Sequence, residues 1–371
     1  MTPARRLAVL LSALVLLGGA AAGYASWAAR REARPASAAA GPLRPGQLMF
    51  LTAGGRVAGV PLGEARAASP SASSAVPVTT PPVLPSASPA VPVTASPVLP
   101  PSSPAVPAAS PAVPPAVSTA LPSVVGPVCD RFSTAGGTSI CLVANPGVPA
   151  TTDAVILDRS MRETRRIKLA GIPNRARVSP SGRMVSWTVF VTGDSYSQGG
   201  FSTWTGILDT RTGYAVTNIE DIPLTLNGRR HHAPDVNYWG VTFAADDNRF
   251  YATVATRGST YLVEGDYREW RARTLRENVE CPSLSPDGTR LVFKKRVSAD
   301  PRRMWRLHLL DLSTMRETPL AETASVDDQA AWLDGRTVMY AKASDVWSVP
   351  ADGSGTPAPL LRGAASPVVV P

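Results

Sequence analysis

Four stretches in the C-terminal part of the chain share one pattern of apolar and polar positions. In each, a strand of alternating apolar residues meets a tight turn of small and polar residues, and a second apolar strand follows. The four stretches are residues 176–187, 241–254, 281–295 and 330–342. Alternation with a period of two is typical of strands, and Gly or Asn supplies the backbone conformation that a tight turn needs.

A second pattern alternates with the first along the chain. Here a strand ends at Asp or Gly and turns back, in residues 154–164, 205–213, 260–270, 307–318 and 345–355. The two patterns together predict units of four short strands, and four-stranded units of about 40–50 residues are typical of a β-propeller. Five units follow, at 128–172, 173–235, 236–278, 279–324 and 325–362. A β-sandwich with similar turns is the alternative.

The two ends of the predicted propeller each contain part of a further unit. Residues 46–62 form two alternating apolar runs around Gly54-Gly55, which predicts a hairpin without an inner strand. Residues 364–370 read as an inner strand without partners. Pairing them would complete a sixth blade and leave no open edge in the ring.

The turns also carry a family resemblance. Ser285-Pro286-Asp287-Gly288 is a complete S-P-D-G turn before an apolar strand, and Ser179-Pro180-Ser181-Gly182 differs from it at one position. This marker resembles that of the TolB-like (WD40-like repeat) β-propeller family, and the whole chain resembles membrane-anchored TolB-like proteins of actinobacteria. The resemblance implies an all-β, six-bladed TolB-like propeller over 128–371. It implies no chemistry, because one fold carries many functions.

The region before the propeller differs in composition. Residues 1–34 contain an uncharged apolar run from Leu7 to Ala29 with arginines on both sides, which predicts a transmembrane signal anchor. Cleavage as a signal peptide and secretion is the alternative. Residues 67–127 are rich in Pro, Ala, Ser and Val, so we expect a disordered, extended linker inserted between the hairpin and the first blade.

Charge supports a membrane rather than a nucleic acid as the neighbour of this chain. Residues 1–66 carry eight Arg and two Glu, 67–127 carry no charge, and 128–371 carry 29 basic and 26 acidic residues. A nucleic-acid surface needs a basic stripe on the folded domain, so we expect no nucleic-acid partner. Basic residues beside an apolar run suit a membrane surface. The expected location is the cell membrane, as a single-pass monomer with the propeller outside.

Catalytic motifs are not found. A peptidase of the α/β-hydrolase type needs G-x-S-x-G, and the nearest strings, 193–197 and 137–141, lack the second Gly. The three His and three Cys show no spacing typical of a metal site. The sequence therefore predicts a protein that is not an enzyme and that has no cofactor. Cys129 and Cys141 bracket a Gly136-Gly137 turn, which makes a disulfide the favoured reading over two separate thiols.

Residues just before the inner strands should meet at one mouth of the propeller channel. They are Asn174, Arg175, Arg177, Asp235, Asn237, Trp239, Glu280, Asp327, Asp328 and Gln329. Acidic and basic groups face each other across such a mouth, which suits a peptide. We expect a binding scaffold for a protein or peptide of the cell envelope. A polysaccharide-binding or carbohydrate-active propeller is the alternative, because tryptophans recur at about one per unit.

Overall fold

The computed structural model describes residues 41–68, 123–196 and 200–371. Within these ranges, no helix has the length and apolarity needed to cross a membrane. The predicted anchor within residues 1–34 lies outside the described residues, as does most of the predicted linker.

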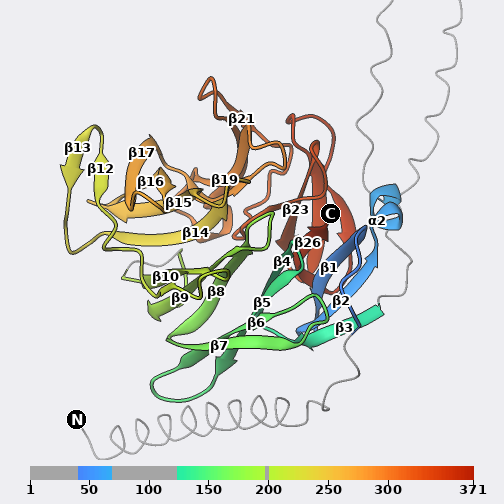
Figure 1. Ribbon diagram of the computed structural model, residues 1–371. Helices are drawn as coiled ribbons and strands as arrows, with labels where there is room; N and C mark the ends of the chain where they lie inside the picture. Colours follow the sequence, from blue (N-terminus) through green and yellow to red (C-terminus); the bar gives the residue numbers. More distant parts are fainter. Residues whose placement is uncertain (1–40, 69–122, 197–199) are drawn as a thin grey trace, which may run out of the picture.

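The strands form six sheets arranged as the blades of a ring (Figure 1). Outer strands such as β7 (Glu163–Ala170) and β21 (Glu317–Pro319) lie at the periphery of the picture. The innermost strands follow one another around the central channel: β4 (Arg131–Ala135), β8 (Ile172–Val178), β14 (Asn237–Phe243), β18 (Glu280–Leu284), β22 (Ala331–Trp332) and β26 (Ala364–Val370). The predicted all-β, six-bladed propeller is therefore confirmed.

Four blades have four strands each, all from one continuous stretch of chain. The first contains β4, β5 (Thr138–Asn145), β6 (Thr151–Leu157) and β7; the second contains β8, β9 (Met184–Thr192), β10 (Ser202–Asp209) and β11 (Ala215–Val216). Another contains β18, β19 (Arg290–Arg296), β20 (Trp305–Asp311) and β21, with the 3₁₀ turn η1 (Pro301–Arg303) before β20; the last contains β22, β23 (Thr337–Lys342), β24 (Asp345–Pro350) and β25 (Ala358–Leu361).

Both ends of the propeller form the closing blade. Inner strand β26 pairs antiparallel with β1 (Gln47–Thr52), which pairs with β2 (Arg56–Pro61). The 46–62 hairpin and the 364–370 strand thus share one sheet, as the sequence predicts. The physical reason is that each piece alone would expose unpaired backbone groups along its edge.

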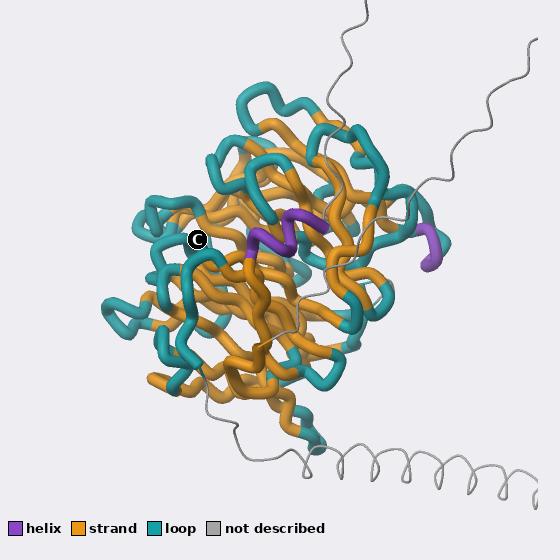
Figure 2. The backbone as a smooth tube through the Cα atoms, turned by 90° about the vertical axis from the view of Figure 1, so that its right-hand side faces the viewer, coloured by secondary structure: helices purple, strands orange, loops and turns teal. Residues whose placement is uncertain are grey.

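The outermost strand of the closing blade corrects the predicted boundaries. Strand β3 (Ser123–Val128) pairs with β2, so the last residues of the predicted 67–127 linker belong to the sheet. At its other end, that linker overlaps helix α2 (Leu62–Ala68), which lies across the strands (Figure 2). The valines of this stretch, which we expected in the linker, instead form the edge strand of the blade. Pro127 lies near the end of that strand, where a missing backbone N–H donor is tolerated.

One blade contains six strands, and here the four-stranded prediction is wrong. Strands β14, β15 (Arg249–Thr256), β16 (Ser259–Asp266) and β17 (Arg271–Glu277) form the expected unit. A short hairpin of β12 (Leu224–Leu226) and β13 (Arg229–His231) adds to it through parallel pairing of β12 with β17. The His231 side chain on β13 is buried, and its Nε2 lies 2.9 Å from Thr256 Oγ1.

The predicted turns form as their residues require. At the S-P-D-G turn, the Asp287 carboxylate accepts hydrogen bonds from the Thr289 N–H and hydroxyl, and Gly288 adopts φ 71°. Short polar side chains that bond their own backbone favour such turns. Because these turns join each inner strand to the next strand, they lie at the opposite end of the blades from the predicted binding mouth.

Candidate functional site

The structure brings together most of the side chains that were expected at the mouth. Arg175 lies 3.5 Å from Asp327, the Asn174 amide donates to the Tyr196 hydroxyl at 2.6 Å, and the Tyr196 ring stacks on Trp239. Eight of the ten residues lie in this region: Asn174, Arg175, Arg177, Trp239, Glu280, Asp327, Asp328 and Gln329.

Asp235 and Asn237 do not join this group. The Asp235 carboxylate accepts from the Thr256 hydroxyl and the Arg257 N–H. Asn237 Oδ1 accepts from the N–H and hydroxyl of Thr203 in the neighbouring blade. Both side chains therefore satisfy local backbone and hydroxyl groups, which is a structural role.

Arginine side chains line a small cavity in the channel. Arg131, Arg175 and Arg177 project among Ser133, Asp328 and Gln329, and the remaining cavity has a volume of about 30 Å³. Gln329 donates to the Pro282 and Gly240 carbonyls and so ties three blades together. A cavity of this size does not hold a peptide, whereas the mouth residues Trp239 and Glu280 line a larger pocket.

A buried lysine lies at the centre of the region. Lys294 on β19 is fully buried and forms an ion pair with Asp327. Its Nζ lies 4.8 Å from the ring centre of Tyr196 and 4.5 Å from that of Trp305. A cation over an aromatic face is attracted by the ring quadrupole. The protein therefore already stabilises one ammonium group here with rings and a carboxylate.

An open pocket adjoins this cluster, between the β8–β11 blade, the six-stranded blade and the β18–β21 blade. We call it the aromatic pocket; its volume is about 520 Å³. Its aromatic wall contains Tyr196, Phe201 and Trp239, whose ring centres lie 5.2–5.4 Å apart. The polar lining comes from Ser259, Thr260, Glu277, Asn278, Glu280 and Arg296.

Glu280 is the unusual group in the aromatic pocket. Its side chain is 2% exposed, and its Oε2 has no hydrogen-bond partner among the described residues. Burial raises the pKa of Glu280 to about 7, although Lys294 and Arg296 act in the opposite direction. A buried carboxylate with a free acceptor and a near-neutral pKa is typical of a functional site.

Backbone geometry fixes the position of Glu280. The next residue, Cys281, is a buried free thiol with φ 48°, and a bulge interrupts the pairing of β18 with β19 at this point. Gly240 on β14 packs against it, where a Cβ would lie 2.9 Å from Cys281 Cα. The close approach of these two inner strands therefore requires glycine.

Several residues of the site, among them Lys294, Tyr196 and Phe201, were not among the sequence candidates. Lys294 lies within a strand, in Phe293-Lys294-Lys295. A charged residue on the inner side of this strand was the signal that could have marked it as a site residue. Tyr196 and Phe201 lie between β9 and β10, in a stretch without apolar periodicity. No pattern in that stretch indicates that its rings fold back onto Trp239.

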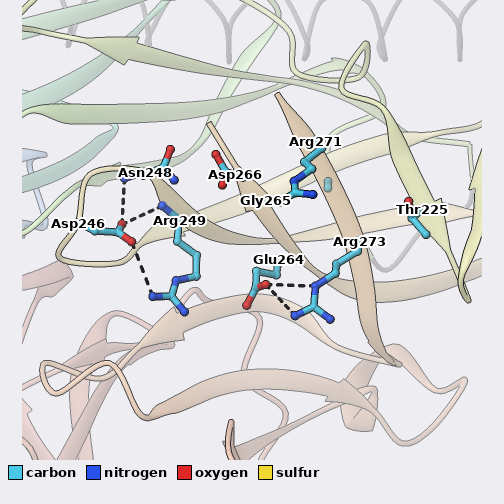
Figure 3. A pocket seen from close by; sticks show the side chains of 10 residues that line it. Thr225, Asp246, Asn248, Arg249, Glu264, Gly265, Asp266, Arg271 and Arg273 are labelled. Carbon is cyan, nitrogen blue, oxygen red and sulfur yellow. Dashed lines mark hydrogen bonds and ion pairs between the residues drawn. The ribbon is translucent and has the colours of Figure 1, made fainter. Parts of the chain in front are cut away.

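A second pocket, of about 480 Å³, lies at the edge of the six-stranded blade (Figure 3). Two ion pairs lie in its lining: Arg249 lies 3.7 Å from Asp246, and Arg273 lies 2.9 Å from Glu264. Exposed pairs of this kind contribute little and attract no particular ligand. We assign no site to this pocket.

Two of the three cysteines form a disulfide, and the third is a free thiol. Cys129 and Cys141 are joined in a disulfide with a Cα–Cα distance of 5.3 Å. Cys129 follows β3 of the closing blade and Cys141 lies on β5, so the bond links the closing blade to its neighbour.

Comparison with known proteins finds no matching family model and no matching curated protein. Similar solved structures include an oligogalacturonate lyase from Vibrio parahaemolyticus (10% identity, 66% of this chain and 70% of that chain, TM-score 0.41). They also include TolB from Acinetobacter baumannii (13%, 62% and 66%, TM-score 0.33) and an acylaminoacyl peptidase from Pyrococcus horikoshii (14%, 61% and 38%, TM-score 0.36). The chain thus spans about two thirds of the lyase and TolB, and little more than a third of the peptidase.

These similarities correct one expectation. The sequence predicts that the chain is not an enzyme, yet the similar structures include a lyase and a peptidase as well as TolB. A propeller of this kind occurs in enzymes too, so the missing hydrolase motif does not exclude catalysis. The predicted propeller fold is confirmed by the strand order of the six blades, and the similar solved structures include TolB. In its fold the chain is a six-bladed β-propeller closed by both of its ends, and TolB is among the solved structures to which it is similar.

Proposed function

We propose that this protein is a membrane-tethered propeller that binds a positively charged segment of a cell-envelope protein or peptide in the aromatic pocket. The observation that carries the proposal is the buried Glu280 carboxylate, with an unpaired Oε2, beside the wall of Tyr196, Phe201 and Trp239. A Lys or Arg side chain would pair with the carboxylate and lie against the rings.

The protein's own Lys294 supports this choice of ligand. Its ammonium already lies over Tyr196 next to Asp327, so the same ring cluster is suited to a cation on its open side. The pocket is lined by two acidic residues, Glu277 and Glu280, and by one basic residue, Arg296. Arg296 lies over the Trp305 ring at 5.0 Å and donates to the Tyr196 carbonyl, so it is held by the cluster rather than facing a ligand alone.

The position of the pocket also suits a tethered binding protein. The described residues next to the predicted anchor and linker lie at one end of the closing blade. There the Gly46 N–H donates to the Val370 carbonyl, and Ser123 pairs with Gly59. The loop between β15 and β16 and the start of β18, which line the pocket, lie at the other end of the blades. A ligand therefore approaches the face that is turned away from these attachment points.

Binding of short capped peptides tests the proposal. Ala-Ala-Lys-Ala-Ala and the same peptide with norleucine differ only in the charge at the end of one side chain. Isothermal titration with the full-length chain in detergent should show binding of the Lys peptide only. Equal binding of the Lys and norleucine peptides would contradict a cation site, and so would a failure to bind both the Lys peptide and its Arg analogue. Binding of an uncharged oligosaccharide in their place would favour the polysaccharide alternative.

The tether has its own test. If residues 1–34 anchor the chain, washing membranes with alkaline carbonate should leave the full-length protein in the pellet. A soluble product that begins near Gly23 would show cleavage instead, and would leave the pocket proposal unaffected.

A further inference from the structure

The small cavity inside the channel is lined by more positive than negative charge. Arg131 on β4 and Arg175 and Arg177 on β8 surround it, and Asp328 is the acidic residue of the lining. Among the described residues, the Asp328 carboxylate accepts from the Ala341 N–H and forms no ion pair with these arginines. The cavity therefore lies in a local excess of positive charge.

Several donors around the cavity have no partner. Arg175 is 7% exposed, and the Nε–H groups of Arg175 and Arg177 are buried without a hydrogen-bond acceptor among the described residues. Arg177 uses one Nη2 contact, to the Ala330 carbonyl, and Arg131 bonds the Asn174 and Asp130 carbonyls. Guanidinium groups cannot lose their protons in proteins, so buried ones need acceptors.

Charges on the neighbouring elements do not remove this excess. Asp327 is shared between Lys294 and Arg175. Burial raises the pKa of Glu280 to about 7, so this carboxyl is only partly ionised at neutral pH. Burial also lowers the pKa of Arg177 to about 10, while the nearby Asp328 carboxylate acts in the opposite direction.

We propose that this cavity is a binding site for one small monatomic anion, chloride under ordinary conditions. The volume of about 30 Å³ holds about one water-sized particle, and chloride is only slightly larger than water. We expect larger anions such as sulfate to bind there less well. Acting as an acceptor for Arg131, Arg175 and Arg177, the ion joins two inner strands at the axis of the ring.

Halide dependence of stability tests the site in the unaltered full-length chain. The melting temperature is measured as sodium chloride replaces sodium gluconate at constant ionic strength. We expect a rise of several degrees that saturates with chloride and that bromide reproduces. Sulfate at equal ionic strength should not reproduce it. Broadening of the chloride-35 NMR line by the protein, reversed when bromide is added, would detect the bound ion directly.

The Arg177→Met variant keeps an unbranched apolar stem and removes the guanidinium group and its charge. It should weaken the chloride dependence at least tenfold, whereas Arg273→Met, at an exposed ion pair, should leave it unchanged. A melting temperature that follows ionic strength alone, with no excess line broadening, would overturn the proposal and indicate a water-filled cavity. Because the halide measurements use the wild-type chain, they decide the question even if Arg177→Met does not fold.

Discussion

Replacing Glu280 with Gln should stabilise the protein, and increasingly so as the pH rises. The pKa of Glu280 rises from 4.5 to about 7 in the folded chain because the side chain is buried. The folded state therefore binds this proton more tightly than the unfolded state does. The stability that this proton contributes is present below pH 4.5 and is lost as the pH rises to about 7.

The size of the effect follows from the two pKa values. Each tenfold change in proton affinity corresponds to about 1.4 kcal/mol, so ionising Glu280 in the folded chain costs about 3 kcal/mol above pH 7. Glutamine has nearly the same shape and avoids this cost. For a domain of this size, about 3 kcal/mol corresponds to a change of about 6–12 °C in melting temperature.

The assay is a series of melting curves for wild type and Glu280→Gln between pH 5 and 8. The advantage of the variant should grow across this range and level off above pH 7. Glu277→Gln is the matched control, because Glu277 lines the same pocket but is exposed. If the difference between Glu280→Gln and wild type does not change with pH, the carboxyl is not held near neutrality, and the reasoning fails.

Further variants test the packing around the site and the closure of the ring. Deleting residues 364–371 removes the inner strand of the closing blade and should lower the melting temperature by more than about 10 °C; unchanged melting would refute closure. Asp327→Asn should lower the free energy of unfolding by about 3 kcal/mol in denaturant titrations, because it leaves the buried Lys294 without its carboxylate. Adding Lys294→Met should restore part of that loss, and no recovery would argue against the ion pair. Cys129→Ser should lower the free energy of unfolding by about 3 kcal/mol in the same assay, because it removes the disulfide. Equal stability of the reduced and oxidised wild type would contradict this.

The repeat made the propeller predictable from the sequence, because strand alternation and turn residues are local properties. Ring closure was also predictable, since residues 46–62 and 364–370 each lack a neighbour that the other supplies. Strand β3 was not, because Ser123–Val128 has the composition of the linker before it. Its strand character comes only from pairing with β2.

The candidate site was predictable only in part. Chain topology places the starts of the inner strands together, so Arg175, Asp327 and Glu280 could be grouped. The arginines that line the channel cavity, and the loop that carries Tyr196 onto Trp239, depend on side-chain packing across blades. Such packing leaves no periodic signal, so the open pocket beside the channel was found only in the structure.

Binding of a cationic side chain to the aromatic pocket is the central claim, and its pH dependence tests it most directly. The affinity for Ala-Ala-Lys-Ala-Ala is measured by titration calorimetry at pH 6 and pH 8. Because only ionised Glu280 pairs with the ammonium, affinity should rise about tenfold between these values. It should be lost in Glu280→Gln and kept in Glu264→Gln, whose carboxylate lines the other pocket. Affinity that is independent of pH, or unchanged in Glu280→Gln, would contradict the account.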